Sequence, residues 1–423
     1  MINKINKKWF FAAGLSLLLL APRGAHAIVG TVDNVPAATL LVPYFEVDLS
    51  NPSGLTTLFS VNNASATAIL AKVTMWTDLG VPTLSFNVYL TGYDVQTINV
   101  RDLLYGTIAA TASAGQDPHD AISPKGPSSQ DINFATCTGQ LPAPALTPDF
   151  SQGLRNAHTG AASSLFAAAC GAQSFGDNIA RGYITVDTVN QCSSLKPGDA
   201  GYFSSVTTTQ NVLWGDYFFL DPNNNFAKGD ALVHIEASTT NPLTSTANAY
   251  TFYGQLDDTA WSAEDHREAL GSAYAARFLN GGTFTGGSQL VVWRDSRTTQ
   301  SSFTCGVPPA GLGQEDLYAF DEQETPFSLN ALTPFPARTQ KVQVNSLSLP
   351  VAPTFGWLYM NLNHGNGTGP STGDPAAAQS FVAYTMDASG RFSVGQPGVV
   401  LESASTTVSH CLPGGTLNGS QCQ

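Results

Sequence analysis

The strongest constraint on the fold is a stretch, residues 39–104, in which apolar side chains recur at every second position. Phe59 and Val61, for example, fall on one face, and Leu58, Ser60 and Asn62 on the other. Successive side chains of a β-strand point to opposite faces, so this period is typical of a sheet with one buried face. Turn-forming residues at 50–54 and 80–82 separate the apolar runs. The stretch predicts an antiparallel, immunoglobulin-like sheet.

The rest of the chain predicts a mainly β protein built of antiparallel β-sandwich units, with long loop excursions and one or two short helices. Two segments have helical composition, 160–169 and 264–279, the second followed by Asn-Gly-Gly as a stop signal. An Asp-Ala-Ser-Gly turn at 387–390 predicts a hairpin. Further strands are expected at 182–188, 212–220, 231–237, 250–256, 288–293, 339–349, 356–362, 381–386 and 391–394.

These patterns divide the chain into five parts. The expected parts are a signal peptide (1–27), an N-terminal immunoglobulin-like sheet (28–107), a loop-rich excursion with a disulfide (108–180), a second β-rich unit with a short helix (181–300), and C-terminal strands with a disulfide loop that could complete the earlier sandwiches (301–423).

The first 27 residues have the three regions of a secretory signal. Lys4, Lys7 and Lys8 precede an apolar run, and Ala25-His26-Ala27 is a small-x-small cleavage site. The apolar run is shorter than the ~20 residues that span a bilayer. We therefore expect cleavage near Ala27, no membrane span, and a location in the periplasm, at the cell surface or outside the cell.

The charge of the chain excludes some partners. Without its first 27 residues the chain keeps 14 basic and 31 acidic residues, a net charge of −17. Nucleic acids and anionic membranes repel such a surface. Surface glycans, other surface proteins or further copies of the chain are the partners that remain.

Six cysteines lie beyond the signal region. An even number in an exported protein predicts disulfides. Cys411 and Cys422 bracket a short loop and are expected to pair; Cys137 with Cys170, and Cys192 with Cys305, are the other expected bridges. Six cysteines allow 15 pairings, so the spacing supports only the first bridge.

One loop offers several oxygen ligands. Residues 221–230 read DPNNNFAKGD, and Asp221 and Asp230 could contribute carboxylates to a calcium ion. The spacing is not that of an EF-hand, and Asn-rich hairpin loops also arise because asparagine tolerates positive φ. No other cofactor is indicated.

The most polar stretch combines acids, a histidine and arginines. Such a cluster could dock a helix through ion pairs, bind a ligand or ion, or support general acid–base chemistry. The candidate ligand-binding residues are Asp257, Asp258, Glu264, Asp265, His266, Arg267 and Arg294.

Several short segments resemble a group of exported bacterial proteins of unassigned function that have an N-terminal immunoglobulin-like sheet. They are Leu41–Asp48, Asn62–Ser65, Leu90–Asp94, Ala275–Phe278 and Val292–Asp295. The resemblance covers most of the chain. It implies export, and it implies no activity and no functional residue.

The sequence favours an exported, non-catalytic protein with a structural or binding role at the cell surface or outside the cell, because β-sandwiches usually bind through exposed loops on a rigid scaffold. A calcium-dependent adhesion or surface-layer module is one alternative. A secreted hydrolase or carbohydrate-active enzyme is another, and would need paired carboxyl groups in a cleft.

Overall fold

The computed structural model describes the chain from residue 34, with gaps. The gaps are residues 109–134, 138–139, 142, 242–243, 246–250, 255–263, 281–286, 296–300, 348, 350–354, 364–378, 389–392 and most of 404–423, where only the strand backbones at 417–418 and 421–422 are described. The expected signal peptide, the Cys411–Cys422 bridge, and Asp257 and Asp258 lie outside the described residues.

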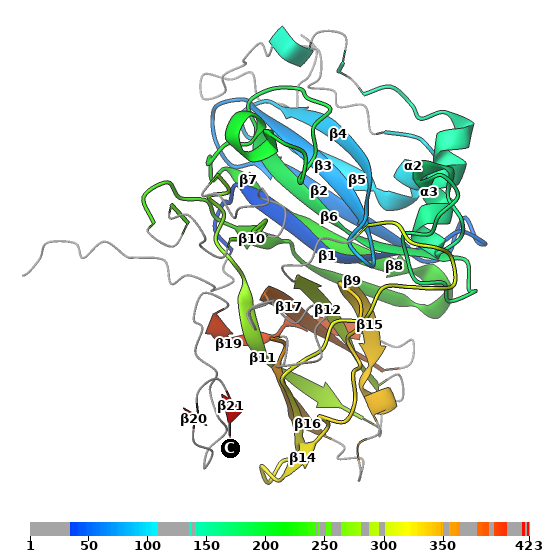
Figure 1. Ribbon diagram of the computed structural model, residues 1–423, viewed down its shortest axis with the longest axis vertical. Coiled ribbons are helices and arrows are strands. Elements are labelled where there is room, and N and C mark those ends of the chain that lie inside the picture. The colour runs from blue at the N-terminus through cyan, green and yellow to red at the C-terminus, as the bar shows by residue number, and fades with distance from the viewer. Residues whose placement is uncertain are drawn as a thin grey trace, which may run out of the picture.

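The first half of the described chain forms two facing antiparallel sheets, the first sandwich (Figure 1). One sheet has the order β10-β1-β6-β3-β4, and the other β5-β2-β8-β9, with β7 beside β2. The bounds are β1 (Thr39–Asp48), β2 (Thr56–Asn63), β3 (Ile69–Thr77), β4 (Pro82–Leu90), β5 (Val95–Asn99), β6 (Ile179–Val189), β7 (Leu213–Trp214), β8 (Asp216–Asp221), β9 (Phe226–Ala231) and β10 (Val233–Ile235).

The second half forms another pair of sheets, the second sandwich, which is the lower part of Figure 1. Its sheets have the orders β15-β12-β17-β18 and β14-β13-β16-β11-β19. The bounds are β11 (Gly271–Leu279), β12 (Gly287–Asp295), β13 (Asp316–Phe320), β14 (Pro326–Ser328), β15 (Thr339–Gln343), β16 (Phe355–Asn361), β17 (Gln379–Asp387), β18 (Ser393–Pro397) and β19 (Val399–Ser403). A short ladder pairs β20 (Leu417–Asn418) with β21 (Gln421–Cys422).

The mainly β, antiparallel sandwich class expected from the alternation is confirmed. The runs within 39–104 become β1 to β5, followed by a short helix at 100–104. Strands β17 and β18 pair antiparallel, as the hairpin expected at 387–390 requires, and residues 389–392 of its turn lie outside the described residues. Each sheet of the first sandwich contains strands from more than one of the expected units. Strands β6, β8, β9 and β10 pair with the N-terminal strands and complete their sheets. The immunoglobulin-like strand arrangement stays a prediction.

The two sandwiches share apolar contacts because β12 is buried on both faces. Val291 and Trp293 pack into the core of the first sandwich, whereas Leu290 and Val292 face the core of the second. The Trp293 ring lies edge-on to Tyr183 of β6, with ring centroids 6.0 Å apart. A strand with two buried faces reads as a continuous apolar run rather than an alternating one.

Polar contacts reinforce this junction. Lys341 of β15 pairs with Glu46 of β1. Thr339 donates its backbone N–H to the Asp78 carbonyl at 3.0 Å, and Ser393 of β18 donates to the Ala227 carbonyl of β9 at 2.6 Å. The sandwiches are therefore joined by side chains and backbone from both halves of the chain.

Both predicted helices were wrong, one in its position and the other in its type of secondary structure. Residues 271–279 form strand β11, because Tyr274, Ala276 and Phe278 alternate into the core of the second sandwich. Alanines in this run favour a helix in isolation, and tertiary packing overrides that preference. Beside the short α2 (Val100–Leu104), the main helix is α3 (Pro148–Thr159), which ends where a helix was expected to begin.

The ends of α3 have recognisable sequence causes. Thr147 accepts a hydrogen bond from the Phe150 N–H at 3.3 Å and is followed by Pro148, a residue suited to the first turn. Gly160 closes the helix with φ 74°, a left-handed conformation that glycine adopts without a steric penalty.

Four cysteines form two bridges, Cys137–Cys192 and Cys170–Cys305, each with a Cα–Cα distance of 5.0 Å. The expected pairing of Cys137 with Cys170 and of Cys192 with Cys305 was therefore wrong. Backbone contacts explain the observed pairing. Cys170 and Phe303 exchange two hydrogen bonds of 2.9 Å, and the Cys192 N–H donates to the Thr136 hydroxyl at 3.0 Å. These contacts place partners from distant parts of the sequence side by side.

Within the described part of the chain, no helix combines the length and the apolar character that crossing a membrane requires.

Two buried groups make stability depend on pH in opposite directions. The His158 imidazole contacts the Thr83 hydroxyl and the Arg181 carbonyl, each at 2.9 Å, and burial lowers its pKa from 6.5 to about 4. Burial raises the pKa of Asp78 from 3.8 to about 7. Hydrogen bonds to its carboxylate oppose this rise, and the bond from the Gln173 N–H opposes it most. Below pH 6.5 the unfolded chain protonates His158 and the folded chain does not, so acid destabilises the fold through this group. Above about pH 4 the unfolded chain ionises Asp78 and the folded chain does not, so rising pH destabilises the fold.

We expect single substitutions to separate these effects. With Asp78→Asn, the free energy of unfolding should rise by about 3 kcal/mol between pH 4 and pH 6.5, the contribution of His158. With His158→Gln, it should fall over the same range. Urea unfolding of both variants at the two pH values measures the slopes, and equal slopes in the two variants would contradict this assignment.

Candidate functional site

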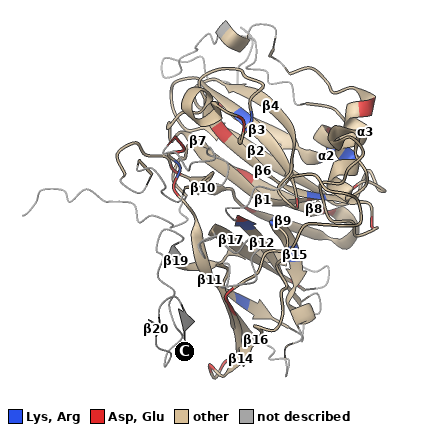
Figure 2. Ribbon diagram, viewed as in Figure 1, with Lys and Arg blue, Asp and Glu red and all other residues tan. Residues whose placement is uncertain are grey.

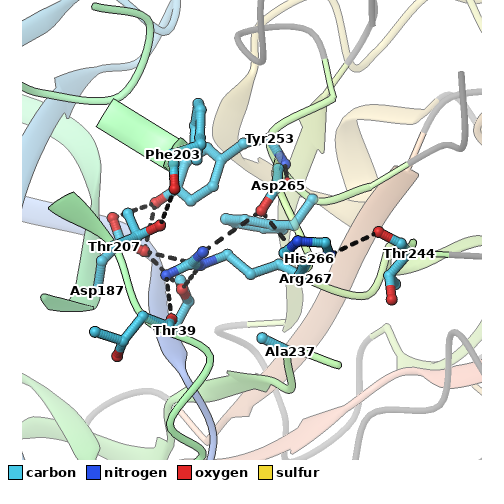
Figure 3. A network of polar contacts seen from close by, with 12 residues as sticks. Thr39, Asp187, Phe203, Thr207, Ala237, Thr244, Tyr253, Asp265, His266 and Arg267 are labelled. Atoms are coloured by element: carbon cyan, nitrogen blue, oxygen red, sulfur yellow. Dashed lines mark hydrogen bonds and ion pairs between the residues drawn. The ribbon is translucent and has the colours of Figure 1, made fainter. Parts of the chain in front are cut away.

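The polar stretch around residue 267 forms a buried junction rather than an open site. The Arg267 guanidinium lies 3.4 Å from the Asp187 carboxylate of β6 and 3.5 Å from the Asp265 carboxylate (Figure 3). All three side chains are at most 1% exposed. The arginine and the two carboxylates thus join the 264–270 segment to the first sandwich.

Hydroxyl and backbone groups complete the network. Tyr202 and Thr39 donate to Asp187 at 2.7 and 2.6 Å, and the Tyr253 hydroxyl donates to it at 3.0 Å. The Tyr253 N–H donates to Asp265 at 2.8 Å. Buried charges are stable only when they are paired and hydrogen-bonded, and this network meets both conditions.

The electrostatics of the network agree with a structural role. Burial would lower the pKa of Arg267, but Asp187 and Asp265 outweigh it and raise that pKa. Burial, together with the Asp187 charge, holds the pKa of Tyr202 and of Tyr253 well above 10. The arginine therefore stays charged and the phenols stay neutral hydrogen-bond donors.

The other candidates from the polar stretch are dispersed. Glu264 is exposed, and His266 contacts the Thr244 carbonyl through Nδ1 at 3.0 Å. Arg294 is buried at the end of β12 and donates to the carbonyls of Phe335, Gly313 and Leu362, the first at 2.8 Å and the others at 2.5 Å. The structure brings Asp265 and Arg267 together and holds Arg294 in a separate backbone contact.

The two candidate calcium ligands are also separated. Asp221 and Asp230 lie in one hairpin, β8–β9, but Asp221 pairs with Phe226 at its tip, whereas Asp230 pairs with Tyr217 four rungs away. Four rungs of a strand correspond to roughly 13 Å. Asp221 accepts a hydrogen bond from Asn224 at 2.7 Å. Among the described residues, no group of three or more His, Cys, Asp or Glu side chains is placed to hold a metal.

An exposed aromatic surface lies on the second sandwich. Leu317 and Ala319 of β13, and Leu358 and Met360 of β16, face its core. The residues between them face outward, and we call this surface the aromatic face. Its members are Tyr318, Phe320, Phe355, Trp357 and Tyr359.

The rings of the aromatic face form rows across the two strands. Tyr318 lies opposite Tyr359, and Phe320 lies opposite Trp357. Phe320 and Trp357 stack, with ring centroids 4.2 Å apart and planes 9° from parallel. Phe355 is 38% exposed, and the other four are half-buried. Solvent-facing positions of an antiparallel sheet are usually polar, so five aromatic residues there require a reason.

A hollow of about 790 Å³ lies beside these rings. Phe355 and Trp357 form one wall, and Tyr384 and Val399 contribute further apolar surface. This volume is within the range of pockets that bind small molecules.

Charged groups surround the hollow. Arg277 of β11 lies opposite Trp357 on the ladder, is exposed, and has no carboxylate within 4 Å among the described residues. Asp321, Glu322 and Glu324 line it from the β13–β14 turn. Elsewhere, charged residues are sparse over both sandwiches (Figure 2). The hollow thus combines aromatic walls with carboxylate acceptors and one guanidinium donor.

The aromatic face has a signal in the sequence. Residues 355–359 place aromatic side chains at every second position, and so do residues 318–320. Alternation alone does not reveal which side of a strand faces solvent, so these residues read equally well as core.

Comparison with known proteins gives no relative: no family model, no curated protein and no solved structure matches this chain.

Proposed function

We propose that this chain is an exported, non-catalytic carbohydrate-binding protein that acts at the cell surface or outside the cell, and that the aromatic face binds a neutral oligosaccharide. The observation that carries the proposal is the outward alternation of five aromatic side chains on the neighbouring strands β13 and β16.

Stacking chemistry favours a sugar as the ligand. The face of an aromatic ring carries partial negative charge, and the C–H bonds on one side of a pyranose ring carry partial positive charge. Phe320 and Trp357 stack on each other, so each ring keeps one face for this contact, and Trp357 lines the hollow. Because the rows continue along both strands, they suit a chain of sugars better than a single one.

The polar groups of the hollow suit neutral hydroxyls. Carboxylates of Asp321, Glu322 and Glu324 accept hydrogen bonds from hydroxyl groups, and Arg277 donates to hydroxyl or ring oxygens. An acidic polysaccharide would meet three carboxylates here and a strongly negative chain overall.

Export is supported by the signal-like N-terminal sequence and by the two disulfides, because disulfides persist in oxidising compartments. The resemblance to exported bacterial proteins supports the same location. A non-catalytic role is favoured because Asp265, one of the acids that a hydrolase could use in a carboxyl pair, pairs with Arg267 instead.

An oligosaccharide array tests this proposal. We expect the disulfide-intact protein to bind a subset of neutral glycans, and Trp357→Ala to weaken that binding at least tenfold, or about 1.4 kcal/mol. Trp357→Phe should keep part of the affinity because it keeps a ring.

Phe175→Ala is the matched control, because Phe175 is 55% exposed and lies in the loop before β6, a strand of the first sandwich. It should bind like the unmodified protein. Equal binding by the Trp357→Ala variant, with unchanged thermal stability, would rule out the aromatic face as the site.

A further inference from the structure

A second cleft opens on the outer face of the first sandwich. It has a volume of about 350 Å³ and lies where β2, β5 and β8 meet the short helix α2. Its walls include Leu58, Thr97, Asp102, Asp216 and Phe218. The volume is suited to a ligand smaller than an oligosaccharide.

The aromatic wall of this cleft has a defined position. Phe218 is 42% exposed on β8, opposite Gly229 of β9. A Cβ atom at Gly229 would come within 2.4 Å of the Phe218 ring. The absence of a side chain at Gly229 therefore lets the Phe218 ring lie against the sheet, so that its ring borders the cleft.

Two carboxylates in the cleft lack a cationic partner. Ser60 donates to the Asp216 carboxylate at 2.6 Å and orients it, and Asp102 is exposed on α2. Within the described residues, neither carboxylate has a Lys, Arg or His nitrogen within 4 Å, and no basic residue lines the cleft. The neighbouring Arg101 is buried and donates to the carbonyls of Asp48 and Leu55 instead.

We propose that this cleft binds a small alkylammonium ligand, that is, a primary ammonium group on a short alkyl chain. The ammonium group has three N–H donors. The Asp216 carboxylate and the Thr97 hydroxyl can accept hydrogen bonds from them, because Thr97 lies opposite Ser60, the residue that donates to Asp216. Asp102 adds a second negative charge to the lining of the cleft. The Phe218 ring attracts a cation over its face. Leu58 and the other apolar walls contact the alkyl chain. A neutral ligand would leave both carboxylates without a charged partner.

Titration with n-butylammonium, followed by NMR of the folded protein or by calorimetry, tests the proposal. We expect saturable binding that weakens as salt rises, and no binding of n-butanol, which has the same shape but no charge. Asp216→Asn should raise the dissociation constant at least tenfold, and Phe218→Leu should raise it by a smaller factor. Asparagine and leucine match the replaced side chains in size, and thermal unfolding verifies that both variants fold.

The remaining outcomes each decide the proposal. Equal binding of butanol would show an apolar cleft without charge recognition, and calcium binding without butylammonium binding would show a metal site. Either result would overturn the proposal. A butylammonium affinity that Asp216→Asn leaves unchanged would overturn it as well. The proposal is independent of glycan binding, so Trp357→Ala should leave butylammonium affinity unchanged.

Discussion

Replacing Asp187 with alanine is expected to lower the free energy of unfolding by about 3–5 kcal/mol, because it leaves Arg267 buried with one of its two charge partners removed. Asp187 also accepts hydrogen bonds from Thr39, Tyr202 and Tyr253, and these donors would lose their partner in a buried place. Chemical unfolding of the disulfide-intact protein measures the loss.

The Arg181–Asp177 pair provides the matched control. Its atoms lie 2.5 Å apart, but the Asp177 side chain is 40% exposed, so solvent screens the pair. Asp177→Ala should cost at most about 1 kcal/mol. If Asp187→Ala costs no more than this control, the buried network does not hold the 264–270 segment in place.

Removing the Cys170–Cys305 bridge is the second large effect that we expect. The bridge closes a loop with a sequence separation of 135, and it ties α3 and its following segment to residues 301–305. The Cys170→Ser, Cys305→Ser double variant should lose about 2–5 kcal/mol of unfolding free energy, because the unfolded chain gains freedom.

The equivalent double variant at Cys137 and Cys192 is the comparison, since its sequence separation is only 55. Chain entropy predicts a loss smaller by about 0.8 kcal/mol for this bridge. Mass spectrometry of proteolytic fragments, without reduction, verifies the pairing directly. A fragment linking Cys137 to Cys170 would contradict the structure.

Local patterns predicted the parts of the fold that depend on neighbouring residues. The alternation of Phe59 and Val61 places β2 correctly, because a strand with one buried face has an apolar residue at every second position. The hairpin between β17 and β18 was predicted for a similar reason, since turn residues act locally.

The failures concern residues whose partners are distant in sequence. Tyr274 and Phe278 fit a helical period as well as a strand period, and only the pairing of β11 with β16 and β19 makes the strand favourable. The cysteine pairing depends on the approach of Phe303 to Cys170, which no spacing reveals.

The candidate site shows the same limit. The sequence left docking, ligand binding and acid–base chemistry open for the charged cluster around Asp265 and Arg267. The burial of both side chains, a property of the whole fold, indicates docking. Trp357 carries no local signal of binding, because only its sheet partners decide whether its side chain faces the core or the surface.

The most direct test of glycan binding by the aromatic face is saturation-transfer NMR with the best glycan from the array. Irradiation of aromatic protons should transfer saturation to the C–H protons on one side of the sugar rings in the unmodified protein and in Phe175→Ala. The transfer should fall strongly in Trp357→Ala. Transfer of undiminished strength in folded Trp357→Ala, or the absence of any glycan that binds, would contradict the proposed function.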